Sequence, residues 1–377
     1  MMSVSVPSIP ARLGVVQRVL PTYRAPFFEA LAAACRDGLG VLAGSPRPDE
    51  AIEPARELKT ARLFPARNSH LFRSHFYLLA QPGLLQWLAD WQPDVLIVEA
   101  NPRYLSTPAA VRWMHARRRP VIGWGLGAPQ SAGGRAGLRR KFIRQFDALL
   151  TYSSRGAAEY TSLGFPAQRI FVAPNAAAPR PVNPPPQRPD TPSAPLTVLF
   201  TGRLQARKRV DLLLRACAAL PAELQPRLVV VGDGPERAAL QSLANSIYPQ
   251  AEFPGGLYGA DLQPYLNTAD LFVLPGTGGL AVQQAMSAAL PVIAAEADGT
   301  AADLVRPANG WQVQPGSLDS LTSTLAEALA DVPRLRRMGL ESFRIVCDEI
   351  NLEAMVAAFI RAVACVMGGS DAHSTGG

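Results

Sequence analysis

A glycine-rich turn within residues 274–297 carries the residue types best suited to binding an anionic ligand. The segment reads LPGTGGLAVQQAMSAALPVIAAEA, with an apolar, strand-like run just before the glycines and helical spacing over 280–289 after them. Glycines between a strand and a helix let backbone N–H groups approach an anion, and the helix N-terminus adds partial positive charge. The segment predicts a phosphate-binding turn. The alternative is an ordinary tight connection between a strand and a helix.

Two cations occupy an earlier turn in the same half of the chain. In the run LFTGRLQARKRVDLLLRA a strand ends at Gly202, and Arg203 and Lys208 lie in or just beyond the following loop. Arginine offers a planar fork of donors and lysine a point charge, and together they can neutralise a diphosphate. The next strand ends in VVVGDGPER, a second glycine-bracketed turn before a helix. These turns predict a nucleotide-diphosphate site.

Alternating strands and helices must position these turns. Strand patterns and helix patterns alternate on both sides of 179–195, a segment with eight prolines that cannot sustain a helix or a central strand. We therefore predict an α/β fold with two parallel-sheet domains. Their expected bounds are 1–178 for an N-terminal Rossmann-like domain, 179–195 for a proline-rich linker, 196–346 for a second domain, 347–367 for a C-terminal helix and 368–377 for a disordered tail. An apolar stripe at helical spacing over 352–367 predicts that this helix packs back on the body of the protein.

Composition and charge exclude several classes of protein. The 377 residues are 48% hydrophobic, which is typical of a core-rich globular protein, and there is no apolar run of membrane-spanning length or signal-peptide pattern. Four scattered cysteines and four histidines show no metal-ligand spacing, so we expect no metal and free thiols in a reducing cytoplasm. Residues 1–185 carry 23 Lys and Arg against 11 Asp and Glu, a net +12, while the rest carries −5. This basic half predicts contact with an anionic membrane or anionic substrate; without a nucleic-acid motif, we expect no nucleic acid partner.

Taken together, the motifs resemble those of GT-B fold glycosyltransferases of the family 4 type. The landmarks in the second half occur in the family's order, and they run from the Gly202 turn with Lys208 through VVGDGPER, FPGGLY, ADLFVLP, AMSAALPVI and DG to NGWQVQPG. In the first half, PTYRAPFFEAL, VIGWGLG and YSSRGAAEY followed by PNA are also similar. The resemblance therefore covers nearly the whole chain and implies two Rossmann-like domains facing a cleft.

The resemblance implies transfer of a hexose-type sugar from a nucleotide-sugar donor to a glycan or lipid-linked acceptor, with retention, without a metal and with no cofactor besides the donor. The donor would bind the C-terminal domain and the acceptor the N-terminal domain. By correspondence of motifs, Arg203 and Lys208 at the Gly202 turn would hold the diphosphate, and Leu257 would lie near the base. The remaining donor contacts would come from four residues of the glycine turn and its helix: Gly278, Gly279, Leu280 and Gln284.

Two departures from the family pattern concern the chemistry. The family usually carries two glutamates eight positions apart around the glycine turn, where this chain has Gly276 and Gln284. Gln284 keeps an acceptor but loses the extra strength of a charge-assisted bond, about 1–2 kcal/mol. Relatives also often place a histidine where this chain has Leu126. The remaining charged candidate is Glu99, at the end of the strand in DVLIVEANPRYLST, as a catalytic carboxylate.

Residues of the first domain leave structural alternatives open. Glu99 is either an acid/base group or the partner of an ion pair with Arg103 or Arg24. Tyr23 and Arg24, in the first loop after a strand, either contact an anionic or lipid-linked acceptor or serve in capping and packing.

We expect a cytoplasmic enzyme, peripheral at the inner face of the membrane, that builds a surface polysaccharide or glycolipid. The competing hypothesis is a catalytically silent protein of the same fold that binds a sugar nucleotide or a partner. An epimerase or a hydrolase would need catalytic side chains that the sequence does not place.

Overall fold

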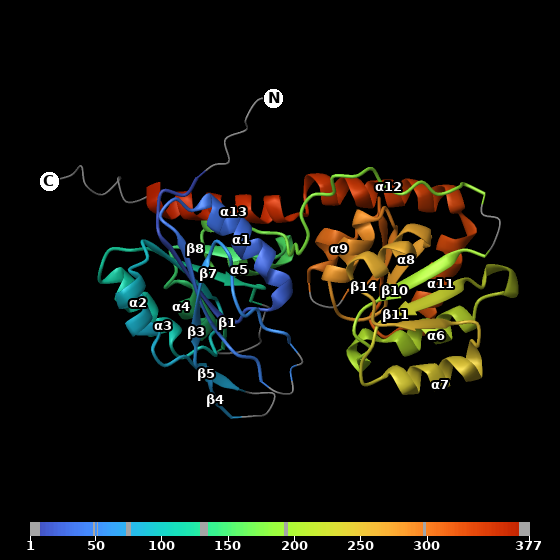
Figure 1. Ribbon diagram of the computed structural model, residues 1–377, viewed down its shortest axis with the longest axis horizontal. Helices are drawn as coiled ribbons and strands as arrows, with labels where there is room; N and C mark the ends of the chain where they lie inside the picture. Colours follow the sequence, from blue (N-terminus) through green and yellow to red (C-terminus); the bar gives the residue numbers. More distant parts are fainter. Residues whose placement is uncertain are drawn as a thin grey trace. The chain divides into compact units, whose positions relative to one another are not determined.

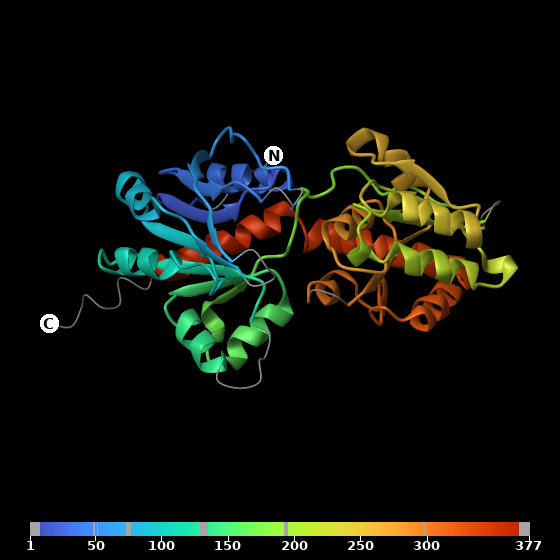
Figure 2. The same cartoon turned by 90° about the horizontal axis from the view of Figure 1, so that it is seen from below.

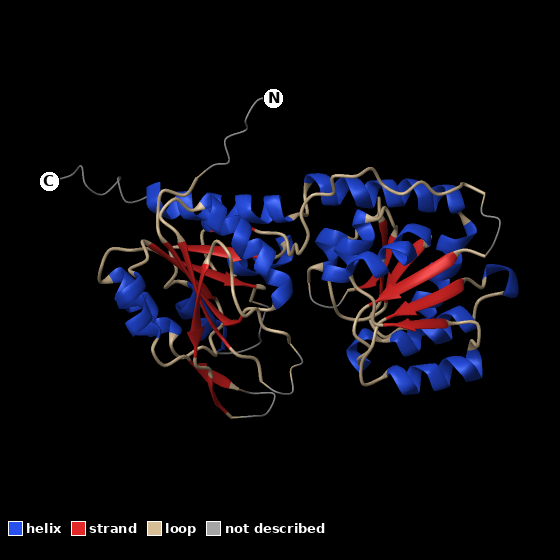
Figure 3. Cartoon of the chain, in the orientation of Figure 1, coloured by secondary structure: helices blue, strands red, loops and turns tan. Residues whose placement is uncertain are grey.

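The structure is a computed structural model that describes residues 8–47, 50, 52–72, 77–128, 135–191, 195–296 and 299–368. The chain divides into two compact units. Unit 1 comprises the chain up to Ala177 together with Leu352 onward, and unit 2 comprises Ala178–Asn351. The predicted tail lies almost wholly outside the described residues, as does Asp298 of the DG motif. Both units are α/β layers with strands enclosed by helices (Figure 3).

Unit 1 is built on a parallel seven-stranded sheet of order β3-β2-β1-β6-β7-β8-β9. Its central strands begin with apolar, buried runs, as expected for strands buried on both faces, and polar residues stand toward the ends of β1 and β6. A short antiparallel hairpin, β4 (Ser69–Leu71) with β5 (Leu78–Ala80), lies outside this sheet. The seven strands are β1 (Leu13–Val19), β2 (Leu39–Gly44), β3 (Arg62–Ala66), β6 (Val95–Glu99), β7 (Val121–Gly125), β8 (Ala148–Thr151) and β9 (Ile170–Val172).

Helices cover both faces of this sheet and bury two separate apolar layers. One layer lies under α1 and α13, which run side by side (Figure 1), and Phe359 of α13 packs on Trp124 with ring centroids 4.9 Å apart. The other layer lies under the remaining helices of the unit. The helices are α1 (Ala25–Ala34), α2 (Leu84–Trp91), α3 (Thr107–His115), α4 (Arg135–Ile143), α5 (Ser154–Ser162) and α13 (Leu352–Gly368), with 3-10 turns at Thr22–Arg24 and Ala167–Arg169.

Unit 2 repeats the architecture with a parallel six-stranded sheet of order β12-β11-β10-β13-β14-β15. Helices α6 and α7 lie on one side of these strands and α8 and α9 on the other (Figure 1). The strands are β10 (Thr197–Thr201), β11 (Arg227–Val231), β12 (Glu252–Gly255), β13 (Leu271–Leu274), β14 (Val292–Ala295) and β15 (Gly310–Val313). The helices are α6 (Val210–Ala218), α7 (Arg237–Ile247), α8 (Gln263–Thr268), α9 (Leu280–Ser287), α10 (Ala301–Leu304), α11 (Leu318–Ala330) and α12 (Val332–Asp348), with 3-10 turns at Ala206–Lys208, Ala222–Leu224 and Gly259–Asp261.

Each sheet reverses its strand order at one place. In unit 1 the chain proceeds from β1 outward through β2 and β3 and then returns to β6 on the other side of β1. In unit 2 the reversal lies between β10 and β13. At such a switch point the loops leaving the two neighbouring strands diverge and open a crevice at the carboxyl ends of the strands, where ligands of open α/β sheets bind. The topology therefore points to one ligand crevice in each unit.

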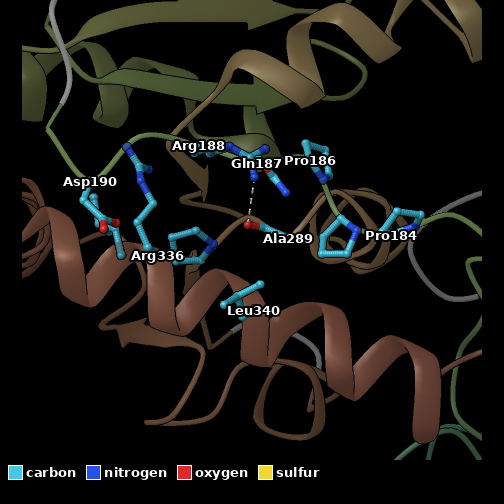
Figure 4. A pocket seen from close by; sticks show the side chains of 11 residues that line it. Pro184, Pro186, Gln187, Arg188, Asp190, Ala289, Arg336 and Leu340 are labelled. Atoms are coloured by element: carbon cyan, nitrogen blue, oxygen red, sulfur yellow. Dashed lines mark hydrogen bonds between the residues drawn. The ribbon is translucent and has the colours of Figure 1, made fainter.

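The proline-rich segment is fastened along unit 2. Arg188 donates three hydrogen bonds to backbone carbonyls: from Nε to Ala269 at 2.6 Å, from Nη2 to Leu266 at 2.8 Å and from Nη1 to Ala289 at 3.2 Å. Figure 4 shows the bond to Ala289. Arg336 of α12 donates to the carbonyl of Pro189. A pocket of about 420 Å³ remains between these prolines and α12. Although the expected spacer lacks helix and strand in its described part, it is anchored rather than free.

The C-terminal region forms two helices, α12 in unit 2 and α13 in unit 1. The predicted helix over 347–367 begins at Leu352, because Cys347 and Asp348 belong to the end of α12. The stretch Val332–Gly368 contains an 18-residue window with a mean hydropathy of 1.8, apolar enough to cross a membrane, and half of that window is buried. Met355, Phe359 and Val363 are at most 1% exposed against the unit 1 core. The predicted packing of this helix on the body is confirmed, and it accounts for the apolar stripe.

Candidate functional site

A polar pocket of about 570 Å³ opens at the switch point of unit 1. It is lined by the ends of β1, β6 and β7 and by the loops that follow them, including Glu99, Tyr23, Arg24 and Leu126. The sequence offered Glu99, Tyr23 and Arg24 as candidate site residues and noted Leu126 as a departure from the family pattern, and the fold brings the four to one place. Leu126 is 61% exposed. Glu99 is therefore the carboxylate among the residues that line this pocket.

Glu99 ends β6 and is held by neutral donors. The backbone N–H of Arg18, at the end of β1, donates to its Oε1 at 2.6 Å, and the Tyr104 hydroxyl forms a second hydrogen bond. Burial raises the pKa of Glu99, an effect that the hydrogen bonds from Arg18 and Tyr104 and the charge of Arg18 only partly offset. Among the described residues Glu99 forms no ion pair, so the alternative of a bridge to Arg24 or Arg103 is wrong. A carboxylate with a raised pKa in a pocket is suited to accepting a proton.

Arg24 is buried at the same pocket, on the 3-10 turn after β1. Only 9% of its surface is exposed, and its Nη atoms donate to the Asn175 side chain, the Ala176 carbonyl and the sulfur of Met355. Its guanidinium also lies over the rings of Tyr23 and Tyr152, with centroid distances of 5.7 and 5.5 Å. Tyr23 itself is half exposed.

Arg18 and several amides of this pocket were not predicted from the sequence as site residues. Arg18 Nη1 donates to Glu50 at 2.7 Å, which neutralises its charge. Gln17, Asn101 and Asn175 complete the polar lining. A signal was available for Asn175, since it belongs to the PNA motif. Arg18 carries no such signal, because its role depends on the pairing of β1 with β6, which are about eighty residues apart in the chain.

In unit 2, the glycine turn and the cationic turn meet at the switch point. Lys208 is 9% exposed, and its Nζ occupies the space into which a side chain at Gly278 would project. Its Cε lies 4.0 Å from the position that a side chain at Gly202 would take. Gly278 has φ +145°, a conformation that L side chains rarely adopt. Lys208 therefore joins the loops after β10 and β13, which the sequence had assigned to one diphosphate site.

Gly276 is packed directly on the backbone of the cationic turn. A Cβ atom built there would contact the Arg207 carbonyl oxygen and would lie 2.6 Å from the carbonyl carbon of Lys208. The N–H of Thr277 donates to the same Arg207 carbonyl at 3.1 Å, and Arg207 Nη1 donates to the Thr277 hydroxyl at 2.9 Å. Any side chain at position 276 would force these two loops apart. The close contact gives a physical reason for a glycine at this position.

The other predicted donor residues lie around the same turn. Gly279 precedes α9, Leu280 begins it, and Gln284 projects from it as an exposed side chain. Its neighbour Gln283 is buried and donates to the carbonyl of Ile350 at 3.0 Å, so it has a structural position. Arg203 is exposed, with no hydrogen bond or ion pair to any described residue.

The GDG motif stands beside the cationic turn for reasons of packing. Glycines 232 and 234 allow the loop after β11 to approach the backbone of residues 202 and 204 closely, and the Leu204 N–H donates to the Asp233 carbonyl at 2.8 Å. Leu257 follows β12 and is half-buried against the unit 2 core. Its predicted place near a base stays a prediction. Across the described residues, no three His, Cys, Asp or Glu side chains are grouped to hold a metal ion.

Comparisons with known proteins agree with this geometry. Residues 16–176 match the family model for a glycosyl transferase 4-like domain, and residues 195–331 match the model for glycosyl transferases group 1. The chain is 30% identical over 295 residues to a GDP-mannose-dependent alpha-mannosyltransferase of Mycobacterium tuberculosis, covering 71% of this chain and 74% of the relative. It is 22% identical to a lipopolysaccharide core biosynthesis glycosyltransferase of Rhizobium meliloti, covering 74% of this chain and 87% of the relative.

The fold is also that of a solved structure. Sucrose-phosphate synthase from Thermosynechococcus elongatus superposes with a TM-score of 0.68 at 17% identity, covering 95% of this chain and 99% of that one. The predicted architecture of two Rossmann-like domains is thereby confirmed.

Proposed function

Since the chain belongs to the group 1 glycosyltransferases, with an N-terminal glycosyl transferase 4-like domain, and catalyses nucleotide-sugar-dependent glycosyl transfer, we propose that it transfers a hexose. In this proposal the acceptor is a glycan or a lipid-linked molecule, and the transfer proceeds with retention and without a metal. The observation that carries the assignment of the donor site is the junction of Lys208 with the glycine turn at the switch point of unit 2. The relatives named for GDP-mannose and for lipopolysaccharide core synthesis support a hexose donor and a surface-glycan product.

In the proposed donor complex, Arg203 and Lys208 bind the diphosphate. Their two positive charges stabilise the negative charge that develops on the diphosphate as the sugar leaves, the task that a metal serves in other transferases. The N–H groups of Gly278, Gly279 and Leu280, before and at the start of α9, contact the sugar and phosphate. Gln284 accepts a hydrogen bond from a ribose hydroxyl, and Leu257 contacts the base.

The pocket of unit 1 binds the acceptor in this proposal. Glu99 orients the acceptor hydroxyl and takes up its proton. The acceptor oxygen bonds to the anomeric carbon on the face from which the diphosphate departs, and the bond from that carbon to the diphosphate breaks, so that the configuration is retained. The raised pKa of Glu99 supports this role, because a base works best when its pKa lies near the operating pH. Tyr23 and Arg24 contact the acceptor beside it.

Gly276 gives the silent-binding hypothesis its physical basis. A side chain that family members use at this position cannot be accommodated by the observed loops, so the sugar would be held by backbone groups and by Gln284. The two hypotheses differ in one result. Purified protein incubated with GDP-mannose, UDP-glucose and an acceptor extract gives labelled product if it is a transferase. Donor binding without product from any acceptor would favour the silent alternative.

We also propose that unit 1 contacts an anionic membrane from the cytoplasmic side. Helix α4 places the exposed Arg140 and Lys141 beside Leu138, which is 72% exposed. Cations flanking an exposed apolar residue favour binding at a lipid surface. Sedimentation with phosphatidylglycerol vesicles should retain the protein, with much weaker retention by phosphatidylcholine vesicles and by the variant Leu138→Glu. Equal retention by both lipids would contradict the proposal.

A further inference from the structure

We propose that the acceptor carries an anionic group, a phosphate or a carboxylate, and that Arg24 binds it in the pocket of unit 1. This inference rests on the proposed function, in which that pocket receives the acceptor. It assigns the chemical class of the substrate rather than its identity.

The first observation is that the buried charge of Arg24 has no counter-charge. Arg24 is 91% buried, and no carboxylate among the described residues forms an ion pair with its guanidinium. A buried charge is costly unless it is paired and hydrogen-bonded. The two tyrosine rings give some compensation through their faces, but they carry no charge. A ligand anion would supply the missing charge.

The second observation concerns the donors that Arg24 has left. A guanidinium has five N–H groups. Three hydrogen bonds of Arg24 are described, all of them donated by Nη atoms and all accepted by neutral groups. Nε and one further N–H remain for a ligand at a residue that lines the pocket. Two adjacent N–H groups match the two oxygens of a carboxylate or phosphate in a forked geometry.

The contrast with Arg18 strengthens the assignment. Both arginines line the same pocket, but Arg18 is paired with Glu50 at 2.7 Å and is therefore neutralised within the protein. Glu99, the pocket's own carboxylate, is hydrogen-bonded by the Arg18 N–H and Tyr104 rather than by Arg24. The pocket thus holds one positive charge that the fold leaves for a ligand.

The size of the pocket fits an acceptor with two functional ends. A volume of about 570 Å³ lies within the range of small-molecule sites. An acceptor that places a hydroxyl at Glu99 and an anionic group at Arg24 would be a uronic acid or a phosphorylated sugar or polyol, free or at the end of a larger chain. A neutral sugar would leave Arg24 uncompensated and should bind more weakly.

Direct anion binding tests this inference without requiring transfer. In an Arg203→Ala/Lys208→Met background, which disables the proposed donor phosphate site, calorimetric titrations would use inorganic phosphate, glucuronate and neutral glucose. We expect the two anions to bind at least tenfold more tightly than glucose, and this preference to be lost on adding Arg24→Gln. Arg24→Lys should retain part of it, and Arg103→Gln, an exposed arginine outside the pocket lining, should leave it unchanged. Tight binding of phosphate alone would identify a phosphorylated acceptor, and of glucuronate alone a uronic acid.

Two results would overturn the inference: equal affinity for glucuronate, phosphate and glucose, or anion binding that survives Arg24→Gln. Thermal unfolding of each variant shows whether the protein is folded, and Arg24→Lys keeps the test valid if Arg24→Gln is unstable. Transfer assays separate the two proposals. Transfer to a neutral acceptor with unchanged kcat/KM in Arg24→Gln would leave the function standing and remove the anionic acceptor. Anion binding at Arg24 without transfer would support the anion site and contradict the proposed transferase function.

Discussion

The two units place their candidate sites at the same topological position and equip them with different chemistry. In unit 1 the switch point between β1 and β6 presents side chains, with a carboxylate of raised pKa and a buried arginine. In unit 2 the switch point between β10 and β13 presents glycine backbone and a lysine ammonium. One fold therefore positions a carboxylate of raised pKa in one unit, which we propose as the proton acceptor, and a glycine turn with a lysine in the other, which we propose as the anion-binding turn. The comparison teaches that topology fixes where a ligand binds, and residue type fixes which ligand it is.

The largest expected effect is a fall in kcat on substitution of Glu99 in unit 1. Glu99→Gln removes the proton acceptor and should lower kcat by about 100-fold or more, the range typical of general bases. In the wild type the rate should fall on acidification through the raised pKa of Glu99, because only the carboxylate form accepts a proton. The variant should lose this dependence. Steady-state rates as a function of pH test it, with the exposed Glu57→Gln as control; an unchanged kcat would remove Glu99 from the chemistry.

The pH dependence of the free energy of unfolding is a second test of the Glu99→Gln variant. The pKa of Glu99 is higher in the folded state than in the unfolded state, so at a pH between these two pKa values the folded state binds more protons. The stability of the wild type should therefore fall relative to that of Glu99→Gln as the pH rises from the unfolded to the folded pKa. Denaturant titrations at several pH values would measure it.

The next effect tests the charge in unit 2. Lys208→Met keeps the aliphatic chain in its buried position and removes the ammonium beside Gly278. Since a hydrogen bond to a charged group contributes about 1.5–3 kcal/mol, kcat/KM for the donor should fall roughly 10- to 100-fold. Arg215→Ala, an exposed arginine on α6, is the control and should leave kcat/KM unchanged. Full activity in Lys208→Met would mean that the diphosphate binds elsewhere.

A change of stability should follow from filling the glycine contact. Gly276→Ala introduces a Cβ against the backbone of residues 207 and 208, and overpacking of this kind costs about 1–3 kcal/mol. A fall in Tm of about 2–10 °C is expected. Gly279→Ala is the matched control for stability alone, because its nearest neighbours lie 3.6 Å away. Gly276→Glu should likewise lose stability rather than gain activity. A more active Gly276→Glu enzyme would contradict the observed packing.

The smallest effect concerns Gln284. Gln284→Glu would strengthen the predicted ribose contact by about 1–2 kcal/mol and tighten nucleoside diphosphate binding about tenfold. Gln283→Glu, one position earlier, should instead destabilise the protein, because Gln283 donates to the carbonyls of Ala178 and Ile350 and a carboxylate cannot. Affinity and Tm measured for both variants separate the two neighbours. A tighter complex with Gln283→Glu but not Gln284→Glu would reverse the assignment.

The sequence was sufficient for the periodic parts of the fold and for the glycine motifs. Alternating apolar strands and helices predicted both sheets, and the stripe over 352–367 predicted the packing of α13. The segment between residues 44 and 92 is harder to predict, although it contains β3, the hairpin β4–β5 and α2. Its strands are short and half exposed, so their hydrophobic pattern is weak. The amphipathic run LLQWLADW of α2 was the detectable signal there.

The site was less predictable, because its decisive contacts join distant segments. Arg24 and Asn175 are 151 residues apart, and Arg18 and Glu50 are 32 apart. The reason for glycine at position 276 lies in the backbone of residues 207 and 208, which no local pattern reveals. The hydrogen bonds by which Arg188 anchors the proline-rich segment likewise go to carbonyls that are 78 to 101 residues away in the chain.

The central claim, that unit 2 alone binds the donor nucleotide, is tested most directly by calorimetric titration of UDP, GDP and ADP into three proteins. We predict that one nucleotide binds the wild type and Glu99→Gln with the same Kd and binds Lys208→Met at least tenfold more weakly. The same Kd in all three proteins, or a Kd that changes in Glu99→Gln and not in Lys208→Met, would contradict the claim.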